Sequence, residues 1–321
     1  MKVLANDGID SSAVEALERA GFTVQTDKIE QEDLEDRINE FDVLLVRSAT
    51  KVRQNLIDAG TNLKIIGRGG VGMDNIDVEY ARGKGIKVIN TPAASSVSVA
   101  ELVFAHLFAI CRFIPQNNRS MPTEGMQKFK ELKKASGKGT ELRGKTLGII
   151  GCGKIGQETA SIAIGCGMKV LLSATTIKTI EISPLIDASY MERLGIIKIQ
   201  TVSKEELLEN SDFVSLHIPA QDKPVIGASE LAMMKKGAGL VNCARGGVVD
   251  EAALVSALQS GHIAYAGVDV YENEPPTNDA ILKENNVSLT PHIGGATSEA
   301  QLRVGLELVS QIIKTLGQQN A

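Results

Sequence analysis

Three side chains in the last third of the sequence, Arg245, Glu274 and His292, could together remove a proton and stabilise an anion. A histidine exchanges protons readily at neutral pH because its ordinary pKa is about 6.5. A neighbouring carboxylate would fix its tautomer, and a guanidinium would bind an anionic oxygen. This combination suits the oxidation of a hydroxyl group beside a carboxylate, in which a proton leaves the oxygen as a hydride leaves the carbon. Taken singly, each residue is equally well explained as an ordinary loop residue.

A glycine-rich turn upstream of these residues has the form that binds the phosphates of a dinucleotide. Residues 146–150 predict a buried strand, and a helical pattern begins directly after the Gly-Cys-Gly-Lys-Ile-Gly sequence at 151–156. The first glycine permits the tight turn, the second lets a pyrophosphate approach the backbone, and the third lets helix and strand pack closely. The backbone amides after the second glycine would face the anion at the positive end of the helix. The residues assigned to this turn are Gly151, Gly153, Lys154, Ile155 and Gly156.

The end of the next predicted strand bears on the choice of coenzyme. Dinucleotide folds ordinarily place an acidic residue there, where it binds the ribose 2′-hydroxyl. Here the strand is followed by Ser173, Ala174 and Thr175, and no carboxylate occurs before Glu181. Without that anion nothing repels a 2′-phosphate, and Lys178 and the neighbouring hydroxyl groups could bind one. NAD(H), held by backbone groups, and NADP(H) therefore both remain open.

The elements that must position these residues form a regular alternation. Short β-branched segments predict strands at 2–5, 43–47, 64–67, 87–90, 146–150, 169–172, 213–217, 239–242, 264–268 and 287–289. Amphipathic patterns predict helices at 12–20, 33–40, 97–113, 156–163, 204–209, 251–259 and 298–316. This alternation indicates an α/β fold with parallel sheets and right-handed crossovers. Because ligands bind outside the carboxyl ends of such strands, we expect the polar strand ends to converge on one crevice.

Two loops, 90–96 and 291–295, each lead into a long helical pattern and indicate joints between domains. Division at these loops predicts one domain of residues 1–96 and 293–321 and a second domain of residues 97–292. The second domain contains the glycine turn and all three residues of the proton-transfer set.

Composition limits the partners that the protein can have. The 321 residues correspond to about two domains of ~150 residues. A net charge of −5 and the absence of tryptophan argue against a nucleic-acid surface, which needs basic and aromatic side chains. Four cysteines without C-x-x-C spacing indicate reduced thiols and no metal site, and no apolar segment is long enough to cross a bilayer. We therefore expect a cytoplasmic protein that binds neither nucleic acid nor membranes.

Taken together, these segments resemble the D-isomer-specific 2-hydroxyacid dehydrogenase family, and within it most closely the branch that oxidises D-3-phosphoglycerate. The likeness extends from about Lys2 to Leu316, and besides the segments above it includes residues 45–52, 67–75, 144–149 and 244–251. The resemblance implies a flavodoxin-like substrate-binding domain into which a Rossmann nucleotide-binding domain is inserted, each with a doubly wound parallel sheet. It also implies NAD(P)-dependent oxidation of 3-phospho-D-glycerate to 3-phosphohydroxypyruvate, the first step of L-serine biosynthesis, by a homodimer.

The same resemblance assigns roles to individual residues. Arg245 would orient the substrate, Glu274 would pair with the histidine, and His292 would exchange the proton. Asp269 would meet the nicotinamide carboxamide. The coenzyme contacts that it implies are Val71, Gly151, Gly153, Lys154, Ile155, Gly156, Ser173, Ala174, Thr175, His217, Ile218, Cys243, Ala244, Arg245, Asp269, His292, Gly294 and Gly295. The substrate contacts that it implies are Arg47, Ser48, Lys51, Gly70, Val71, Arg245 and His292.

A phosphorylated substrate is favoured by two cations, Arg47 and Lys51, because a dianion needs positive charge near it. The same two side chains are also explained as a solvated pair at a strand end. In the resemblance, the backbone amides of Gly70 and Val71 would bind the substrate carboxylate. The polar, lysine-rich segment 116–140 is expected to be a surface excursion or part of a subunit contact.

Some positions depart from the family pattern. Ala174 stands where most NAD-using members have aspartate, and Ile218 replaces a threonine common in the phosphoglycerate branch. Segments 121–138 and 175–189 match poorly, so a phosphate contact supplied there cannot be assigned. The sequence ends at Ala321, without the serine-sensing domains of longer members, and we expect no allosteric serine site.

Two alternative functions remain. A glyoxylate or hydroxypyruvate reductase is favoured by Ala174, because NADPH suits the reductive direction. A dinucleotide-sensing, corepressor-like binding protein could use the same fold, because a fold does not determine a function. The set of arginine, glutamate and histidine argues against this second alternative.

Overall fold

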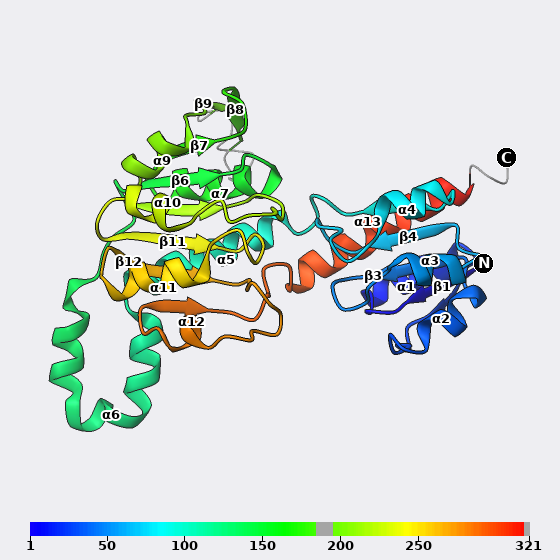
Figure 1. Ribbon diagram of the computed structural model, residues 1–321, viewed down its shortest axis with the longest axis horizontal. Coiled ribbons are helices and arrows are strands. Elements are labelled where there is room, and N and C mark those ends of the chain that lie inside the picture. Colours follow the sequence, from blue (N-terminus) through cyan, green and yellow to red (C-terminus); the bar gives the residue numbers. More distant parts are fainter. Residues whose placement is uncertain (184–194, 318–321) are drawn as a thin grey trace. The chain divides into compact units, whose positions relative to one another are not determined.

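The computed structural model describes residues 1–183 and 195–317, which form two compact units (Figure 1). The first unit combines Met1–Ser96 with Gly295–Ala321, and the second is Val97–Gly294. Residues 184–189 of the poorly matching segment, and the last four residues of the expected first domain, lie outside the described residues.

The second joint lies two residues beyond the position expected from the sequence. The carboxylate of Asp269 accepts hydrogen bonds from the backbone amides of Ile293, at 2.8 Å, and Gly294, at 2.9 Å. These two residues are therefore attached to the second unit, and the first unit resumes only at Gly295.

The first unit contains a five-stranded parallel sheet with the order β2-β1-β3-β4-β5. Its strands are β1 (Lys2–Ala5), β2 (Thr23–Gln25), β3 (Val43–Val46), β4 (Ile65–Arg68) and β5 (Lys87–Asn90). Its helices are α1 (Ser11–Arg19), α2 (Leu34–Arg37), the short 3₁₀ helix η1 (Ile38–Glu40), α3 (Gln54–Ala59), α4 (Val78–Gly83) and α13 (Ser298–Gly317). With the strands numbered along the sequence, the spatial order 2-1-3-4-5 is that of flavodoxin-like sheets.

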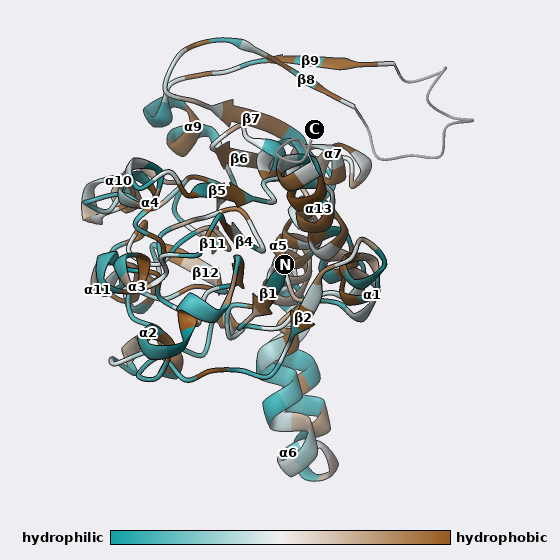
Figure 2. Ribbon diagram, turned by 90° about the vertical axis from the view of Figure 1, so that its right-hand side faces the viewer, coloured by the Kyte–Doolittle hydropathy of each residue, from teal (hydrophilic) through white to brown (hydrophobic). Residues whose placement is uncertain are grey.

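Apolar residues cover both faces of this sheet. On one face, Leu17 of α1 and Leu308 of α13 pack against β1, whose hydrophobic residues appear brown in Figure 2. On the other face, Leu34 of α2 and Leu56 of α3 complete a second cluster. Burial on both sides explains why these strands read as continuous apolar runs.

The second unit contains a six-stranded parallel sheet with the order β13-β12-β11-β10-β6-β7. Its strands are β6 (Thr146–Ile150), β7 (Lys169–Ser173), β10 (Phe213–Leu216), β11 (Ala238–Asn242), β12 (Ile263–Val268) and β13 (Val287–Leu289). The strand order reverses between β6 and β10, and such a reversal is where dinucleotides bind in this class of sheet. The predicted fold class, two doubly wound parallel sheets, is confirmed for the described residues.

A separate two-stranded antiparallel sheet follows β7 in the sequence and was not predicted. It consists of β8 (Thr179–Ile182) and β9 (Ile197–Gln200). Beyond the hairpin, Val202 forms an isolated parallel bridge with Ser173 at the end of β7. The hairpin therefore occupies the chain segment in which a third strand of the nucleotide-binding half would ordinarily follow.

Helices cover both faces of the second sheet. They are α5 (Ser96–Cys111), α6 (Ile114–Ala135), the 3₁₀ helix η2 (Ser136–Lys138), α7 (Lys154–Gly165), α9 (Lys204–Asn210), α10 (Ala228–Met233), α11 (Glu251–Gln259) and α12 (Ala280–Lys283). Residues of α5 and α7 form the core on one face, and residues of α9 to α12 form it on the other.

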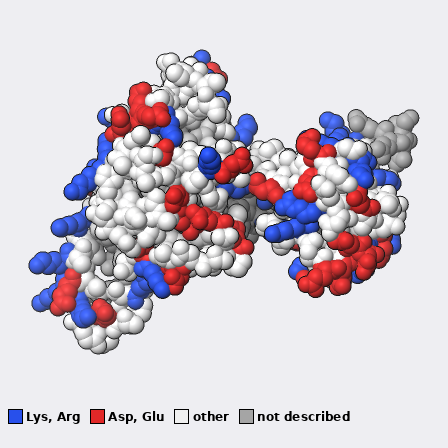
Figure 3. All heavy atoms as spheres, viewed as in Figure 1, with Lys and Arg blue, Asp and Glu red and all other residues white. Residues whose placement is uncertain are grey.

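The polar segment expected as a surface excursion or subunit contact is largely the long helix α6. This helix contains Pro122 and has non-helical backbone angles at Lys128, so it bends. Figure 1 shows α6 extending away from the sheet of its own unit, and Figure 3 shows lysine and arginine side chains along it. Among the described residues, no single helix is both long and apolar enough to cross a membrane; α5 and α6 pass that test only as a bent pair, by length and composition.

Candidate active site

The glycine turn has the geometry that a pyrophosphate requires. It connects β6 to α7, and Gly151 has a φ of 102°, which favours glycine. A Cβ at Gly151 would lie 2.3 Å from the carbonyl oxygen of His217, and one at Gly156 would lie 2.1 Å from the carbonyl oxygen of Gly151. A Cβ at Gly153 would meet no described atom within 4 Å. Gly151 and Gly156 are therefore required by packing, and Gly153 leaves open space at the N-terminus of α7, where an anion is favoured.

The end of β7 lies directly against this turn. The backbone amide of Gly151 donates to the carbonyl oxygen of Ser173 at 2.9 Å, and the thiol of Cys152 donates to the same oxygen at 3.4 Å. Ser173 is buried, whereas Ala174 is half-buried and Thr175 is exposed. The ribose end of a bound dinucleotide would therefore meet small and hydroxyl side chains rather than a carboxylate.

His217 and Ile218 border the turn from the neighbouring strand β10. Burial lowers the pKa of His217 to about 3, so its imidazole is neutral at physiological pH. Its Nε2 lies 2.9 Å from the hydroxyl of Ser215, and its buried Nδ1 has no hydrogen-bond partner among the described residues. A neutral ring adds no positive charge beside the phosphates, so the predicted role of His217 rests on its backbone and shape.

Glu274 and His292, predicted to form a pair, are hydrogen-bonded. The distance between His292 Nδ1 and Glu274 Oε2 is 2.7 Å, and more than a third of each side chain is exposed. If Nδ1 donates its hydrogen to the carboxylate, Nε2 retains the lone pair with which it can accept a proton. The pair therefore has the tautomer and the exposure that a general base needs.

The backbone holds His292 in a rare conformation. Its φ is 54°, in the left-handed region that few non-glycine residues adopt. Its amide donates to the carbonyl oxygen of Asp269 at 2.8 Å, and the carboxylate of that same residue binds the next two amides. Asp269 thus fixes the turn that presents the imidazole.

Asp269 is almost completely buried, with an exposed fraction of 1%, and its carboxylate is surrounded by donors. Besides the two amides, Oδ1 accepts a hydrogen bond from the hydroxyl of Thr290 at 2.6 Å. These three donors compensate for the loss of hydration. The sequence analysis did not predict a role for Thr290, although its position two residues before His292 is a signal that could have identified it.

Arg245 lies on the loop that follows β11, next to the loop that carries Glu274. Its carbonyl oxygen accepts a hydrogen bond from the side chain of Asn242, and its guanidinium donates to the carbonyl oxygen of Ala244 at 2.6 Å. A Cβ at Gly246 would lie 1.7 Å from the carbonyl oxygen of Tyr271, so the two loops are in close contact. Because β11 and β12 are adjacent, Arg245 and Glu274 leave the same edge of the sheet.

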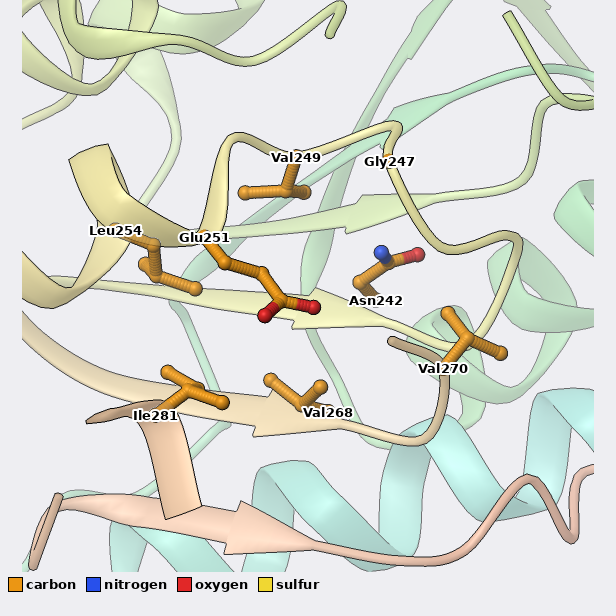
Figure 4. A pocket seen from close by; sticks show the side chains of 8 residues that line it. All are labelled: Asn242, Gly247, Val249, Glu251, Leu254, Val268, Val270 and Ile281. Atoms are coloured by element: carbon orange, nitrogen blue, oxygen red, sulfur yellow. The ribbon is translucent and has the colours of Figure 1, made fainter. Parts of the chain in front are cut away.

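A small apolar hollow supports these loops from one face of the sheet (Figure 4). Its lining residues are Asn242, Gly247, Val249, Glu251, Leu254, Val268, Val270 and Ile281. Glu251 and Glu272 each accept a hydrogen bond from the other's backbone amide. Burial raises the pKa of Glu251, and the charge of Glu272 adds to this effect. The two reciprocal hydrogen bonds thus connect the start of α11 to the loop that carries Glu274.

The thiol of Cys243 is unsuited to chemistry. Burial raises its pKa well above the ordinary value, and the charge of Asp269 adds to this effect. Both Cys243 and Ala244 are buried, so they can line a coenzyme site only by shape and backbone atoms. Among the described residues, no group of three or more histidine, cysteine or acidic side chains is placed to hold a metal ion.

In the first unit, the loop after β3 presents the predicted substrate cations. The carboxylate of Asp7 accepts hydrogen bonds from the backbone amides of Arg47, at 2.6 Å, and Thr50, at 3.1 Å. Gln31 binds the backbone amide and the carbonyl of Lys51. The loop is thus held by its backbone, while Ser48 and Lys51 are exposed and Arg47 is half-buried.

The predicted carboxylate-binding amides lie on the loop after β4. Gly70 has a φ of 140°, and a Cβ there would collide with the guanidinium of Arg68. The side chain of Asn90 donates to the carbonyl oxygen of Val71 at 2.8 Å. Within the described ranges, the backbone amides of Gly70 and Val71 donate to no protein acceptor, so they are available to an anion.

The structure distributes the predicted residues over its two units. The substrate contacts Arg47, Ser48, Lys51, Gly70 and Val71, together with Gly295, belong to the first unit. All other predicted contacts, including the three proton-transfer residues and Asp269, belong to the second unit.

The second unit matches a known protein family along most of its length. Residues 104–294 match the family described as D-isomer specific 2-hydroxyacid dehydrogenase, NAD binding domain. The chain is 44% identical over 322 residues to the hydroxypyruvate reductase of Thermotoga maritima, and the alignment covers 98% of each chain. It is 42% identical over 318 residues to the D-3-phosphoglycerate dehydrogenase of Methanocaldococcus jannaschii, covering 98% of this chain and 57% of that one.

A solved structure of a similar protein matches both units of the chain. The NAD⁺-bound 3-phosphoglycerate dehydrogenase of Entamoeba histolytica matches with a TM-score of 0.76 and 31% identity, covering 99% of this chain and 96% of that one. The chain therefore spans nearly the whole of the Thermotoga relative and little more than half of the Methanocaldococcus relative.

Proposed function

The chain belongs to the D-isomer-specific 2-hydroxyacid dehydrogenase family, and from this premise we propose that it oxidises 3-phospho-D-glycerate to 3-phosphohydroxypyruvate. Members of this family are NAD(P)-dependent oxidoreductases. The observation that carries the proposal is the 2.7 Å hydrogen bond between His292 and Glu274, in the unit that also contains the glycine turn. The reaction would be the first step of L-serine biosynthesis.

Each residue of the proton-transfer set has one task in this proposal. A nicotinamide coenzyme, when bound, would supply the acceptor for the hydride that leaves C2 of the substrate. As the C–H and O–H bonds at C2 break, His292 Nε2 takes the hydroxyl proton and the alcohol becomes a ketone. Glu274 stabilises the resulting imidazolium, which later releases the proton to solvent. Arg245 binds the substrate carboxylate and stabilises the developing charge on oxygen.

The strand ends of the second unit would hold the coenzyme. The backbone amides of Lys154 and Ile155 bind the pyrophosphate at the N-terminus of α7. Asp269 Oδ2 accepts one backbone amide and has a second lone pair for the carboxamide of the nicotinamide. Ser173 and Thr175 would contact the ribose, and Ala174 in place of an acidic residue would permit either NAD(H) or NADP(H).

The first unit would supply the substrate's anion sites. The amides of Gly70 and Val71 bind the carboxylate, and Arg47 and Lys51, with the hydroxyl of Ser48, bind the phosphate. A dianionic phosphate is stabilised by such charge-assisted hydrogen bonds. This part of the proposal is supported by the exposed cations on a loop that Asp7 and Gln31 hold in place.

Initial rates of oxidation of 3-phosphoglycerate and of D-glycerate test the substrate assignment. We expect kcat/KM to favour the phosphorylated substrate, and the Arg47→Ala and Lys51→Ala substitutions each to reduce that preference about tenfold. Lys84→Ala, which removes a cation already paired with Asp58 in the same unit, should leave the preference unchanged. Equal kcat/KM for both substrates in the unmodified protein would contradict the assignment.

A hydroxypyruvate reductase is the second candidate. It is supported by the likeness to the Thermotoga enzyme along almost its entire length and by Ala174 at the end of β7. Reduction of hydroxypyruvate and of 3-phosphohydroxypyruvate, each with NADH and NADPH, separates the two candidates. Ala174→Asp should reduce the use of NADP(H) relative to NAD(H) at least about tenfold, because a carboxylate repels the 2′-phosphate.

The proposal also includes a cytoplasmic homodimer that binds neither nucleic acid nor membranes. Support for the dimer comes from large apolar side chains that stay exposed on α5 and α6, such as Phe108, Met126 and Phe129. Met126 is 96% exposed, an unfavourable state for an apolar residue unless another chain covers it.

A further inference from the structure

We infer that His106, a buried histidine of α5, is a positioning residue for this reaction: through Thr290 it fixes the carboxylate of Asp269 and the turn that presents His292. The inference rests on the proposed function for the roles of Asp269 and His292. The chain of hydrogen bonds itself rests on the geometry of the second unit alone.

The imidazole of His106 is enclosed by the sheet. Its exposed fraction is 2%, and it lies over Gly267 of β12. A Cβ at Gly267 would come within 2.7 Å of the Cβ and 2.9 Å of the Cγ of His106. The glycine therefore makes the space that the ring fills. A buried imidazole in such a tight site is costly unless both of its nitrogens are satisfied.

Both nitrogens meet hydroxyl groups of residues at or just after β13. Nδ1 lies 2.9 Å from the hydroxyl of Ser288, and Nε2 lies 3.1 Å from the hydroxyl of Thr290. Because residues two apart along a strand point to the same face, one ring can reach both hydroxyls. His106 and Thr290 are 184 positions apart in the sequence, and one hydrogen bond between their side chains connects them.

The direction of each hydrogen bond follows from the number of hydrogens available. The Asp269 carboxylate already accepts two backbone amides, and the hydroxyl of Thr290 donates its one hydrogen to it at 2.6 Å. That hydroxyl has no second hydrogen, so Nε2 of His106 must be the donor to it. Nδ1 is then the acceptor, and the hydroxyl of Ser288 donates to it.

The environment keeps the ring of His106 neutral. Burial lowers its pKa, and the charge of Asp269 only partly opposes this effect. A neutral ring with its hydrogen on Nε2 satisfies every group in the chain from Ser288 to Asp269. In the alternative tautomer, Nε2 and the oxygen of the Thr290 hydroxyl would face each other with lone pairs and no hydrogen between them.

This series of hydrogen bonds ends at Asp269, whose backbone and carboxylate hold the turn that contains His292. The carbonyl oxygen of Asp269 accepts the amide of His292, and its carboxylate holds the two residues that follow. His292 adopts a left-handed φ, so its conformation must be imposed by its surroundings. A hydrogen bond to the Thr290 hydroxyl strengthens that hydroxyl as a donor to Asp269. His106 thereby acts on His292 and on the carboxamide site of Asp269 without touching either substrate or coenzyme.

Nitrogen NMR of the histidine side chains tests the first part of the inference without any ligand. The sequence has four histidines, and the signals of His106 can be assigned by their loss in His106→Gln. We expect a neutral Nε2–H tautomer for His106 at neutral pH. A neutral Nδ1–H tautomer, or an imidazolium, would overturn the inferred chain.

A double-mutant cycle on NADH and NADPH affinity tests the second part. Thr290→Val should weaken coenzyme binding about tenfold, and His106→Leu should weaken it severalfold, because a hydrogen bond to a charged group is lost or weakened. The double variant should bind no more weakly than Thr290→Val alone, since His106 acts only through that hydroxyl. Additive losses would show that His106 contributes by packing alone and would overturn the inference.

Conservative variants separate positioning from folding. His106→Gln keeps an N–H donor for Thr290, and Thr290→Ser keeps the hydroxyl, so both should retain coenzyme affinity close to that of the unmodified protein. Urea unfolding of every variant reports any loss of stability separately. If the unmodified protein bound neither coenzyme, the proposed function would fail. The tautomer of His106 would still show whether the hydrogen bonds from Ser288 through His106 and Thr290 to Asp269 are present.

Discussion

At the scale of single residues, the proposed chemistry depends on how the protein prepares one imidazole. The 2.7 Å contact with Glu274 orients the ring of His292 through Nδ1, and the left-handed backbone at His292 is held by Asp269. A carboxylate beside the ring matters most when the ring becomes positively charged. The negative charge of Glu274, and not only its shape, should therefore determine the rate of proton transfer.

Glu274→Gln tests that distinction because it keeps the size of the side chain and an oxygen that can accept from Nδ1. We expect kcat/KM for hydroxy-acid oxidation to fall about a hundredfold, since the imidazolium loses its counter-charge. Coenzyme affinity should be retained because Glu274 does not belong to the predicted coenzyme contacts. Glu272→Gln, a neighbouring acid that binds the backbone of Glu251, is the matched control and should keep its activity. An unchanged kcat/KM in Glu274→Gln would remove the carboxylate from the mechanism.

At the scale of elements, packing between a strand, a turn and a helix determines whether the coenzyme site exists. The helix α7 can approach β6 only because Gly156 presents no Cβ to the carbonyl oxygen of Gly151. The same helix ends at Gly165, where a Cβ would meet no described atom within 4 Å. A side chain therefore cannot be accommodated at Gly156, whereas there is space for one at Gly165 of the same helix.

Gly156→Ala should push α7 away from β6, because the new Cβ would lie 2.1 Å from a backbone oxygen. We expect a loss of roughly 2–4 kcal/mol in the free energy of unfolding and a large loss of coenzyme affinity. Gly165→Ala should be neutral or stabilising by up to about 1 kcal/mol, because alanine is the better helix former. Urea unfolding and coenzyme titration measure both. Equal stability of the two variants would contradict the packing argument.

The alternation of strands and helices was predictable from the sequence because burial on both faces leaves continuous apolar strands. The expected strands at 2–5, 87–90, 146–150 and 287–289 coincide with β1, β5, β6 and β13. The three-residue strand β2 and the short helices α3 and α4 were missed, because so few residues carry no clear period. The hairpin of β8 and β9 was missed because it lies where the chain departs from the family pattern.

The site was predictable only in part, for a physical reason. Arg245, Glu274 and His292 each stand near a strand end, a position that sequence periodicity can locate. The partners that hold them are distant in sequence, since Thr290 lies 184 residues from His106. These polar side chains come together only because β12 pairs with β13 and α5 packs against both strands. No local sequence pattern predicts that packing.

At the scale of the whole molecule, α6 is notable because it exposes large apolar side chains to solvent. Its pattern did not predict a long helix because several of its apolar residues, such as Met126 and Phe129, do not form a buried stripe and remain exposed. The cost of exposing these side chains would be recovered if a second copy of the chain covered them. The bend at Lys128 would then lie within the contact between copies.

Sedimentation velocity of Met126→Glu and Phe129→Glu variants tests the proposed homodimer. We expect the unmodified protein to sediment as a dimer and these variants to shift toward the monomer, because a buried carboxylate without a partner is strongly unfavourable. Ile177→Glu is the matched control, since Ile177 is 71% exposed on the hairpin side of the same unit. A monomeric unmodified protein, or variants that remain dimeric, would contradict the assignment of α6 to the contact.

The role of His292 as proton acceptor is tested by the rate of hydroxy-acid oxidation by His292→Ala compared with that of the unmodified protein. If His292 takes the hydroxyl proton, kcat/KM should fall by about 10²- to 10⁴-fold, far more than the affinity for NADH measured in the same variant. Equal kcat/KM in the two proteins would show that some other group accepts the proton.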